Sequence, residues 1–147
     1  QTQDKPMTAI RDLSTLLANL APQKLEGEWV FCSLSSASAE QEHTLLQDCL
    51  ASFREPEGLS LLLPRRVALA NALPHDGVFH GITLRVHSSL HAVGLTAAVA
   101  DCLTQEGISA NVIAASCHDH VFVPAADSER ALAALESIAR ARLEIPA

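Results

Sequence analysis

Two short segments of this chain carry side chains that could bind a small molecule or a metal ion. Residues 87–96 read HSSLHAVGLT and lie between an apolar strand pattern and an Ala-rich helix pattern. A helix start beside a strand end offers unpaired backbone N–H groups, which bind small anions such as a carboxylate. Residues 117–120 read CHDH, and two histidines on one face of a strand permit chelation. The sequence therefore raises two kinds of site, an anion cradle and a metal centre.

Gly94 and the hydroxyl residues around it have two interpretations. Inside a helix Gly costs about 1 kcal/mol relative to Ala, so some other interaction must compensate. That interaction is either the close approach of a carboxylate to the N–H groups near Gly94 and Leu95, or tight packing of the helix. Ser88, Ser89 and Thr96 could likewise cap the helix or contact a ligand.

Asn111 interrupts an apolar strand pattern, where Asn is disfavoured. A buried side-chain amide needs hydrogen-bond partners for both its N–H groups and its oxygen. The carboxylate and ammonium groups of an amino acid would supply them. The alternative is an amide that bonds to the local backbone.

The histidine segment is a weak candidate for catalysis. His118 and His120 need further ligands to hold zinc, and none lies at a recognised spacing. Cys117 as a nucleophile would need a base and an oxyanion site, and no such motif is present. We therefore expect no metal, no cofactor, no catalytic residue and no enzymatic activity. A metal-dependent enzyme centred on the two histidines is the less favoured alternative, and a simpler role is an ion pair of Asp119 or a subunit contact.

Composition excludes several classes of partner. The chain has 147 residues, enough for one domain or two very small ones, and 48% of them are hydrophobic. A formal net charge of −7 without a basic stripe argues against nucleic-acid binding. No apolar run is long enough to cross a membrane. The four cysteines show no disulfide or metal spacing, which favours reduced thiols in the cytoplasm.

Periodicity predicts alternating helices and strands with a boundary near residues 73–77. In the first half we expect a helix after an N-cap at Thr8, strands at 29–34 and 59–63, a turn at 54–58 and a short helix at 65–72. Residues 35–47 are interpreted as a loop with one helical turn. In the second half we expect a strand at 79–86, a helix from Ser88 or Ser89 to about 105 that ends at Gly107, strands at 109–116 and 119–123, and a final helix after Asp127. The expected division is a disordered tail or cloning remnant at 1–7, one module at 8–76 and a second at 77–147.

Five segments together resemble a family of small stand-alone bacterial ACT-domain proteins. They read EGEWVFCSL, SFREPEGLSLLLP, ITLRVHSSLHAVGLTAAVADCL, GISANVIA and HDHVFVP. The resemblance implies an α+β protein in which two ferredoxin-like βαββαβ modules follow in tandem, with helices covering one face of antiparallel sheets. It also implies a regulatory role rather than catalysis.

The resemblance further implies where a ligand binds. In ACT proteins the ligand lies between two modules and contacts the first strand-to-helix loop of one and the second strand of its neighbour. The implied ligand-binding residues here are Ser88, Ser89, Val93, Gly94, Leu95, Thr96, Asn111, Val112 and Ile113. Where many ACT loops carry Pro-Gly, this chain reads Ala92-Val93-Gly94.

We therefore expect a regulatory sensor that binds a small amino acid or related carboxylate at a module interface. A homodimer or a dimer of dimers is the expected assembly, because such oligomers are usually symmetric. The alternative is a module that binds no ligand and acts only through protein–protein contacts.

Overall fold

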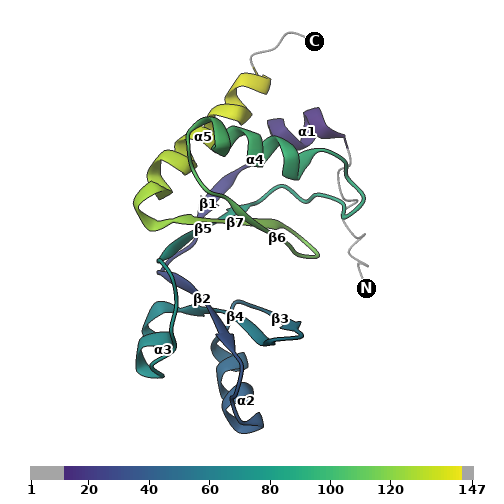
Figure 1. Cartoon of the computed structure of the whole chain (residues 1–147). Helices are drawn as coiled ribbons and strands as arrows, with labels where there is room; N and C mark the ends of the chain where they lie inside the picture. The colour runs from purple at the N-terminus through teal and green to yellow at the C-terminus, as the bar shows by residue number, and fades with distance from the viewer. Residues whose placement is uncertain (1–11, 144–147) are drawn as a thin grey trace, which may run out of the picture. The chain divides into compact units, whose positions relative to one another are not determined.

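A computed structural model describes residues 12–143 and the side chains of residues 12–141 (Figure 1). The chain divides into two compact units. The inserted unit is Glu26–Gly81, and the outer unit combines Gln1–Leu25 with Ile82–Ala147. The expected tail at 1–7 and the expected N-cap Thr8 lie outside the described residues.

The outer unit is a sheet with helices on one face. Its strands lie in the order β1-β5-β7-β6, and both β1 with β5 and β6 with β7 pair antiparallel. Helices α1, α4 and α5 cover one face of these strands (Figure 1). In chain order the elements are α1 (Leu13–Ala18), β1 (Pro22–Lys24), β5 (Phe79–Leu84), α4 (Leu95–Gln105), β6 (Asn111–Ala114), β7 (Asp119–Pro124), a 3₁₀ turn (Ala125–Asp127) and α5 (Ser128–Leu143).

A stripe on α4 fixes this helix on the sheet. Leu95, Val99 and Leu103 recur every four residues and are all buried, so they form one apolar face. They join one core with residues of α1, β5, β7 and α5, including Leu16, Leu17, Ile82, Leu84, Val121, Val123 and Leu135. The helix ends as expected, because Gly107 adopts a left-handed φ of 70° and its N–H bonds to the carbonyl of Thr104.

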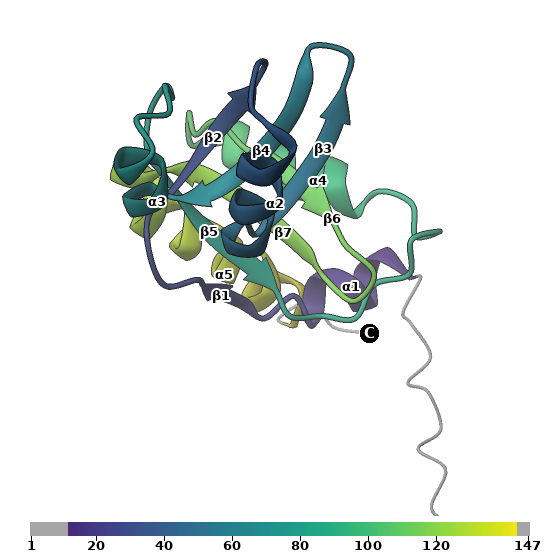
Figure 2. The same ribbon diagram turned by 90° about the horizontal axis from the view of Figure 1, so that it is seen from below.

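The inserted unit repeats the same plan. Its strands lie in the order β3-β4-β2 with antiparallel pairing, and Phe79 at the start of β5 pairs with Trp29. Its helices pack against β4 and β2, with α2 in front of β4 in Figure 2. The elements are β2 (Trp29–Leu34), α2 (Ala39–Asp48), β3 (Ala51–Glu55), β4 (Gly58–Pro64) and α3 (Arg65–Ala70).

Three elements of the first half differ from expectation. The loop expected at 35–47 is instead helix α2, whose face against the sheet holds one fully buried residue, Leu45. Only three of its ten residues are apolar, so the segment resembles a polar loop, although Ser38 is a good N-cap. Strands β1 and β3 were not expected, because β1 has only three residues and β3 is an exposed edge with no alternation of buried and exposed residues.

The two compact units do not coincide with the two modules expected on either side of the boundary between residues 76 and 77. Leu16, Leu17 and Leu20 of the N-terminal segment pack in one core with β5, and β1 pairs with β5. The contacts of residues 12–25 therefore lie with the second half of the chain. Each unit is a β-α-β-β-α run completed by a strand from outside that run, β1 in the outer unit and the start of β5 in the inserted one.

Within residues 12–143, no helix combines the length and the apolar character that a membrane crossing requires.

Candidate ligand-binding site

The loop between β5 and α4 surrounds a cavity of about 370 Å³ in the outer unit. This volume lies within the usual range of small-molecule sites, about 300–1,000 Å³. Most of its lining comes from the expected loop, and the rest comes from the hairpin of β6 and β7. The lining residues are Ser88, Ser89, Leu90, Ala92, Val93, Gly94, Leu95, Thr96, Ala97, Ala114 and Asp119.

Helix α4 begins later than expected. The sequence predicted a start at Ser88 or Ser89, whereas the helix starts at Leu95 and Gly94 is its N-cap. Gly94 has a φ of 98°, a conformation that side chains disfavour, and a Cβ there would lie 3.1 Å from Leu13 Cδ2. Gly94 is therefore required by the turn and by packing against α1, and it is not a weak point inside a helix.

The first turn of α4 has unpaired backbone donors. Helices leave their first N–H groups without an intrahelical acceptor, and a polar N-cap side chain usually supplies one. Gly94 has no side chain to do so, and the first turn contains no acidic residue. Among the described residues, the N–H groups of Leu95, Thr96 and Ala97 have no hydrogen-bond acceptor. Because these residues line the cavity, the open end of α4 is available to a ligand anion.

Ser88 and Asp119 connect the loop to the hairpin. Ser88 is only 7% exposed, and its Oγ donates to Asp119 Oδ2 at 3.4 Å. Ser89 Oγ accepts from the backbone N–H of His91 and stabilises the turn that follows. Neither serine caps α4. Among the described residues Asp119 forms no ion pair of the kind expected, and its Oδ2 accepts instead from the Ser88 hydroxyl.

The β6–β7 hairpin places Asn111 away from the end that borders the cavity. Ala114 pairs with Asp119 beside the cavity, whereas Asn111 pairs with Phe122 three residues further along. Three residues of strand span about 10 Å. The structure therefore brings Ser88, Ser89, Val93, Gly94, Leu95 and Thr96 together around one cavity but does not place Asn111, Val112 or Ile113 in its lining.

Asn111 bonds locally within the chain. It is exposed on the edge strand, and its Nδ2 donates to the carbonyl of Phe122 at 3.2 Å. Its side-chain oxygen accepts no hydrogen bond from the described part of the chain. Val112 packs against the core under the helices, so its side chain cannot also contact a ligand on the opposite face of the sheet.

The histidine segment holds local contacts. His118 Nδ1 donates to the carbonyl of Val86 at 3.4 Å, and its ring lies 6.5 Å from that of His87. His120 Nδ1 is hydrogen-bonded to the hydroxyl of buried Thr83 at 3.0 Å. In the part of the chain that the structure describes, no three His, Cys, Asp or Glu side chains are arranged to hold a metal ion.

His120 should make stability depend on pH. Burial lowers its pKa below the ordinary value of 6.5, His118 lowers the pKa further, and Asp119 opposes both effects. Below pH 6.5 the unfolded chain takes up a proton that the folded chain resists, so the free energy of unfolding should fall as the pH drops. Urea titrations between pH 7.5 and 5 should show this slope. His120→Gln should reduce it, because glutamine takes up no proton over this pH range.

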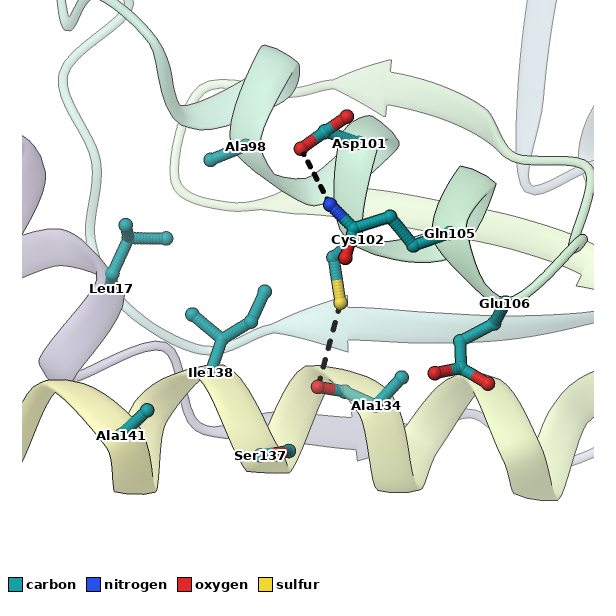
Figure 3. Close-up of a pocket in the computed structure, with 10 residues that line it drawn as sticks. All are labelled: Leu17, Ala98, Asp101, Cys102, Gln105, Glu106, Ala134, Ser137, Ile138 and Ala141. Carbon is teal, nitrogen blue, oxygen red and sulfur yellow. Dashed lines mark hydrogen bonds between the residues drawn. The ribbon is translucent and has the colours of Figure 1, made fainter.

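A second cavity of about 420 Å³ lies between α4 and α5 (Figure 3). Leu17 and Ile138 border it, and Cys102 Sγ donates to the carbonyl of Ala134 at 3.6 Å. Burial raises the pKa of the Cys102 thiol, and Glu106 and Asp101 raise it further. A protonated thiol beside two carboxylates suits neither a nucleophile nor an anion site. This cavity is larger than the loop cavity but has less suitable chemistry for a carboxylate.

The inserted unit lacks an open helix end at the equivalent position. Its first helix, α2, is capped by Ser38, whose Oγ accepts from the N–H of Gln41 at 3.1 Å. Glu40 and Glu42 add two negative charges to the first turn. The cavity there is about 280 Å³ and includes Glu40 in its lining. These features would repel a ligand carboxylate, so the two units differ in the property that makes the loop cavity a candidate site.

Comparison with family models gives two adjacent matches. Residues 8–80 match one model described as an ACT domain, and residues 79–137 match a second model with the same description. These sequence matches follow one another along the chain, whereas the contacts in the structure assign residues 12–25 to the outer unit. No curated protein matches the sequence.

Several solved structures are similar to the chain. A Vibrio cholerae protein described as of unknown function and as a possible transport protein is 44% identical, with 86% of this chain and 95% of that chain covered and a TM-score of 0.77. An Agrobacterium tumefaciens protein is 18% identical over 80% and 87% of the two chains, with a TM-score of 0.63. The regulatory subunit of aspartate kinase from Thermus flavus is 9% identical over 80% and 95%, with a TM-score of 0.56. The last two similarities establish the fold alone.

Proposed function

Because this chain belongs to the ACT-domain family, a family of regulatory ligand-binding modules, we propose that it is a cytoplasmic amino-acid sensor whose site is the loop cavity of the outer unit. The ligand is a small amino acid or a related carboxylate. Its carboxylate accepts hydrogen bonds from the N–H groups of Thr96 and Ala97. The observation that carries this proposal is the uncapped first turn of α4, whose donors open on a cavity.

The open cavity argues against the alternative of a module that binds no ligand. Such a module would have protein side chains filling the crevice near Gly94 and bonding to the first-turn N–H groups. In the described chain these N–H groups are free and a cavity of about 370 Å³ lies beside them. Open N–H donors beside a cavity of small-molecule size favour a binding site for a small anion over a crevice closed by packing.

The contrast between the two units predicts one ligand per chain. The inserted unit supplies its own serine cap and two glutamates where the outer unit supplies open donors. A carboxylate would therefore gain attraction at α4 and meet repulsion at α2.

Assembly would complete the site and couple it to regulation. Leu90 and Val93 both line the cavity and are 68% and 83% exposed, so two large apolar side chains lie uncovered at the site. A second copy would cover them, and the exposed amide of the partner's Asn111 would then reach the ligand. Ligand bound at such a junction stabilises the assembly by linkage and would alter docking to a target protein.

Isothermal titration calorimetry against the twenty amino acids tests the proposal. We expect saturable binding of at least one amino acid with a stoichiometry of one per chain. At a ligand concentration of 100 times Kd, binding should add about 2.7 kcal/mol to the free energy of unfolding. Absence of heat and of any thermal shift with all twenty would contradict amino-acid sensing, and a stoichiometry of two would contradict the assignment to the outer unit alone.

A further inference from the structure

Asp119 occupies a distinctive position in the loop cavity. Among the described residues that line it, Asp119 carries the only charged side chain, and no lysine or arginine is present. The resemblance implied no role for this residue in ligand binding. It reaches the cavity because it is the first residue of β7 and pairs with Ala114 at the end of the hairpin nearest the loop.

The hydrogen bond from Ser88 orients the carboxylate of Asp119. Ser88 is 93% buried, and its hydroxyl donates to only one carboxylate oxygen of Asp119, Oδ2. Within residues 12–141 no side chain donates to the other oxygen, Oδ1, which can accept from a ligand. The same cavity is therefore lined by a carboxylate and by open N–H groups, two groups of opposite polarity.

That polarity matches a zwitterion. The ligand carboxylate is attracted to the start of α4, and an ammonium group on the same carbon atom is attracted to Asp119. The remaining lining consists of small or apolar side chains and hydroxyl groups. A second charge on the ligand would have no partner there, and an unpaired charge is costly to desolvate.

On the basis of the proposed function, we propose that Asp119 binds the ligand's ammonium group, so that the site selects amino acids whose side chains are uncharged. This assigns a specificity-determining role to Asp119 and narrows the ligand class. An acidic side chain would be repelled by Asp119, and a basic one would compete with the ammonium group for a single carboxylate.

Calorimetry with paired probes tests this assignment. For the wild-type protein we compare L-alanine with L-lactate, and L-valine and L-leucine with their 2-hydroxy analogues, in which a hydroxyl replaces the ammonium group. We expect the tightest of these amino acids to bind at least tenfold more tightly than its hydroxy analogue. It should also bind at least tenfold more tightly than aspartate, glutamate, lysine and arginine.

The variant Asp119→Asn removes the charge and keeps an oxygen that can accept from Ser88. We expect its affinity for the amino acid to fall at least tenfold while its affinity for the hydroxy acid is unchanged. Asp101→Asn is the matched control, because Asp101 is an exposed carboxylate on α4 that does not line the loop cavity. It should leave both affinities unchanged.

The outcomes separate the two proposals. Equal binding of amino acid and hydroxy acid, or preferred binding of a charged amino acid, would overturn the role of Asp119 and leave a carboxylate sensor in place. If no probe binds the wild-type protein, both proposals fail. The wild-type comparison holds even if Asp119→Asn does not fold.

Discussion

The variant Thr96→Glu should lose ligand affinity by at least 100-fold without loss of thermal stability. Thr96 is the exposed second residue of α4, and Glu40 occupies the same position of α2 in the inserted unit. A carboxylate there interacts favourably with the open N–H groups and the helix dipole, so it should stabilise the helix by about 0.3–1 kcal/mol. The same charge would lie close to the ligand carboxylate, and two like charges 4 Å apart repel by about 4 kcal/mol at an effective dielectric constant of 20.

Thr96→Gln is the control for this substitution, because glutamine has the same size and no charge. Calorimetry should show near wild-type affinity for it, and thermal melting should show that both variants fold. If Thr96→Glu binds the amino acid as tightly as Thr96→Gln, the ligand carboxylate does not lie at the start of α4.

The variant Gly58→Ala should destabilise the protein by about 3 kcal/mol or more. Gly58 follows the turn between β3 and β4 and has a φ of 141°. A Cβ at this position would lie 2.0 Å from the carbonyl oxygen of Leu34, a backbone atom held in the β2–β4 ladder. Backbone strain and overpacking each cost about 1–3 kcal/mol, a large part of the usual 5–15 kcal/mol of total stability.

Gly107→Ala separates the steric contribution from the backbone contribution. Gly107 also has a positive φ, of 70°, but a Cβ there would meet no atom within 4 Å. Its substitution should cost only about 1–2 kcal/mol. Equilibrium unfolding in urea measures both values, and equal losses for the two variants would show that the contact with Leu34 is relieved by a shift of the chain.

The fold class and the family could be predicted from the sequence, because strong local patterns and several specific segments agreed. Strands such as 29–34 and 119–124 alternate buried and exposed residues or are rich in β-branched and aromatic residues. What could not be predicted is how separate segments combine. β1 is only three residues long, and its pairing with β5, some sixty residues away in sequence, leaves no local pattern.

The loop of the candidate site was predicted from the sequence, but its geometry was not. A glycine after six residues of mixed polarity fits both a helix interior and an N-cap, and only the packing of Leu13 against Gly94 decides between them. Asp119 was missed as a lining residue because its position depends on the register of the β6–β7 hairpin. Asn111 was predicted to contact the ligand because it is a polar residue in a strand, yet an exposed edge strand tolerates such a residue without a ligand.

The most direct test is a crystal structure of the protein grown with the tightest-binding amino acid. We predict density for one ligand per chain in the loop cavity, with its carboxylate within hydrogen-bond distance of the N–H groups of Thr96 and Ala97 and its ammonium group beside Asp119. Density for the amino acid at any other place, with the loop cavity left empty, would contradict the account.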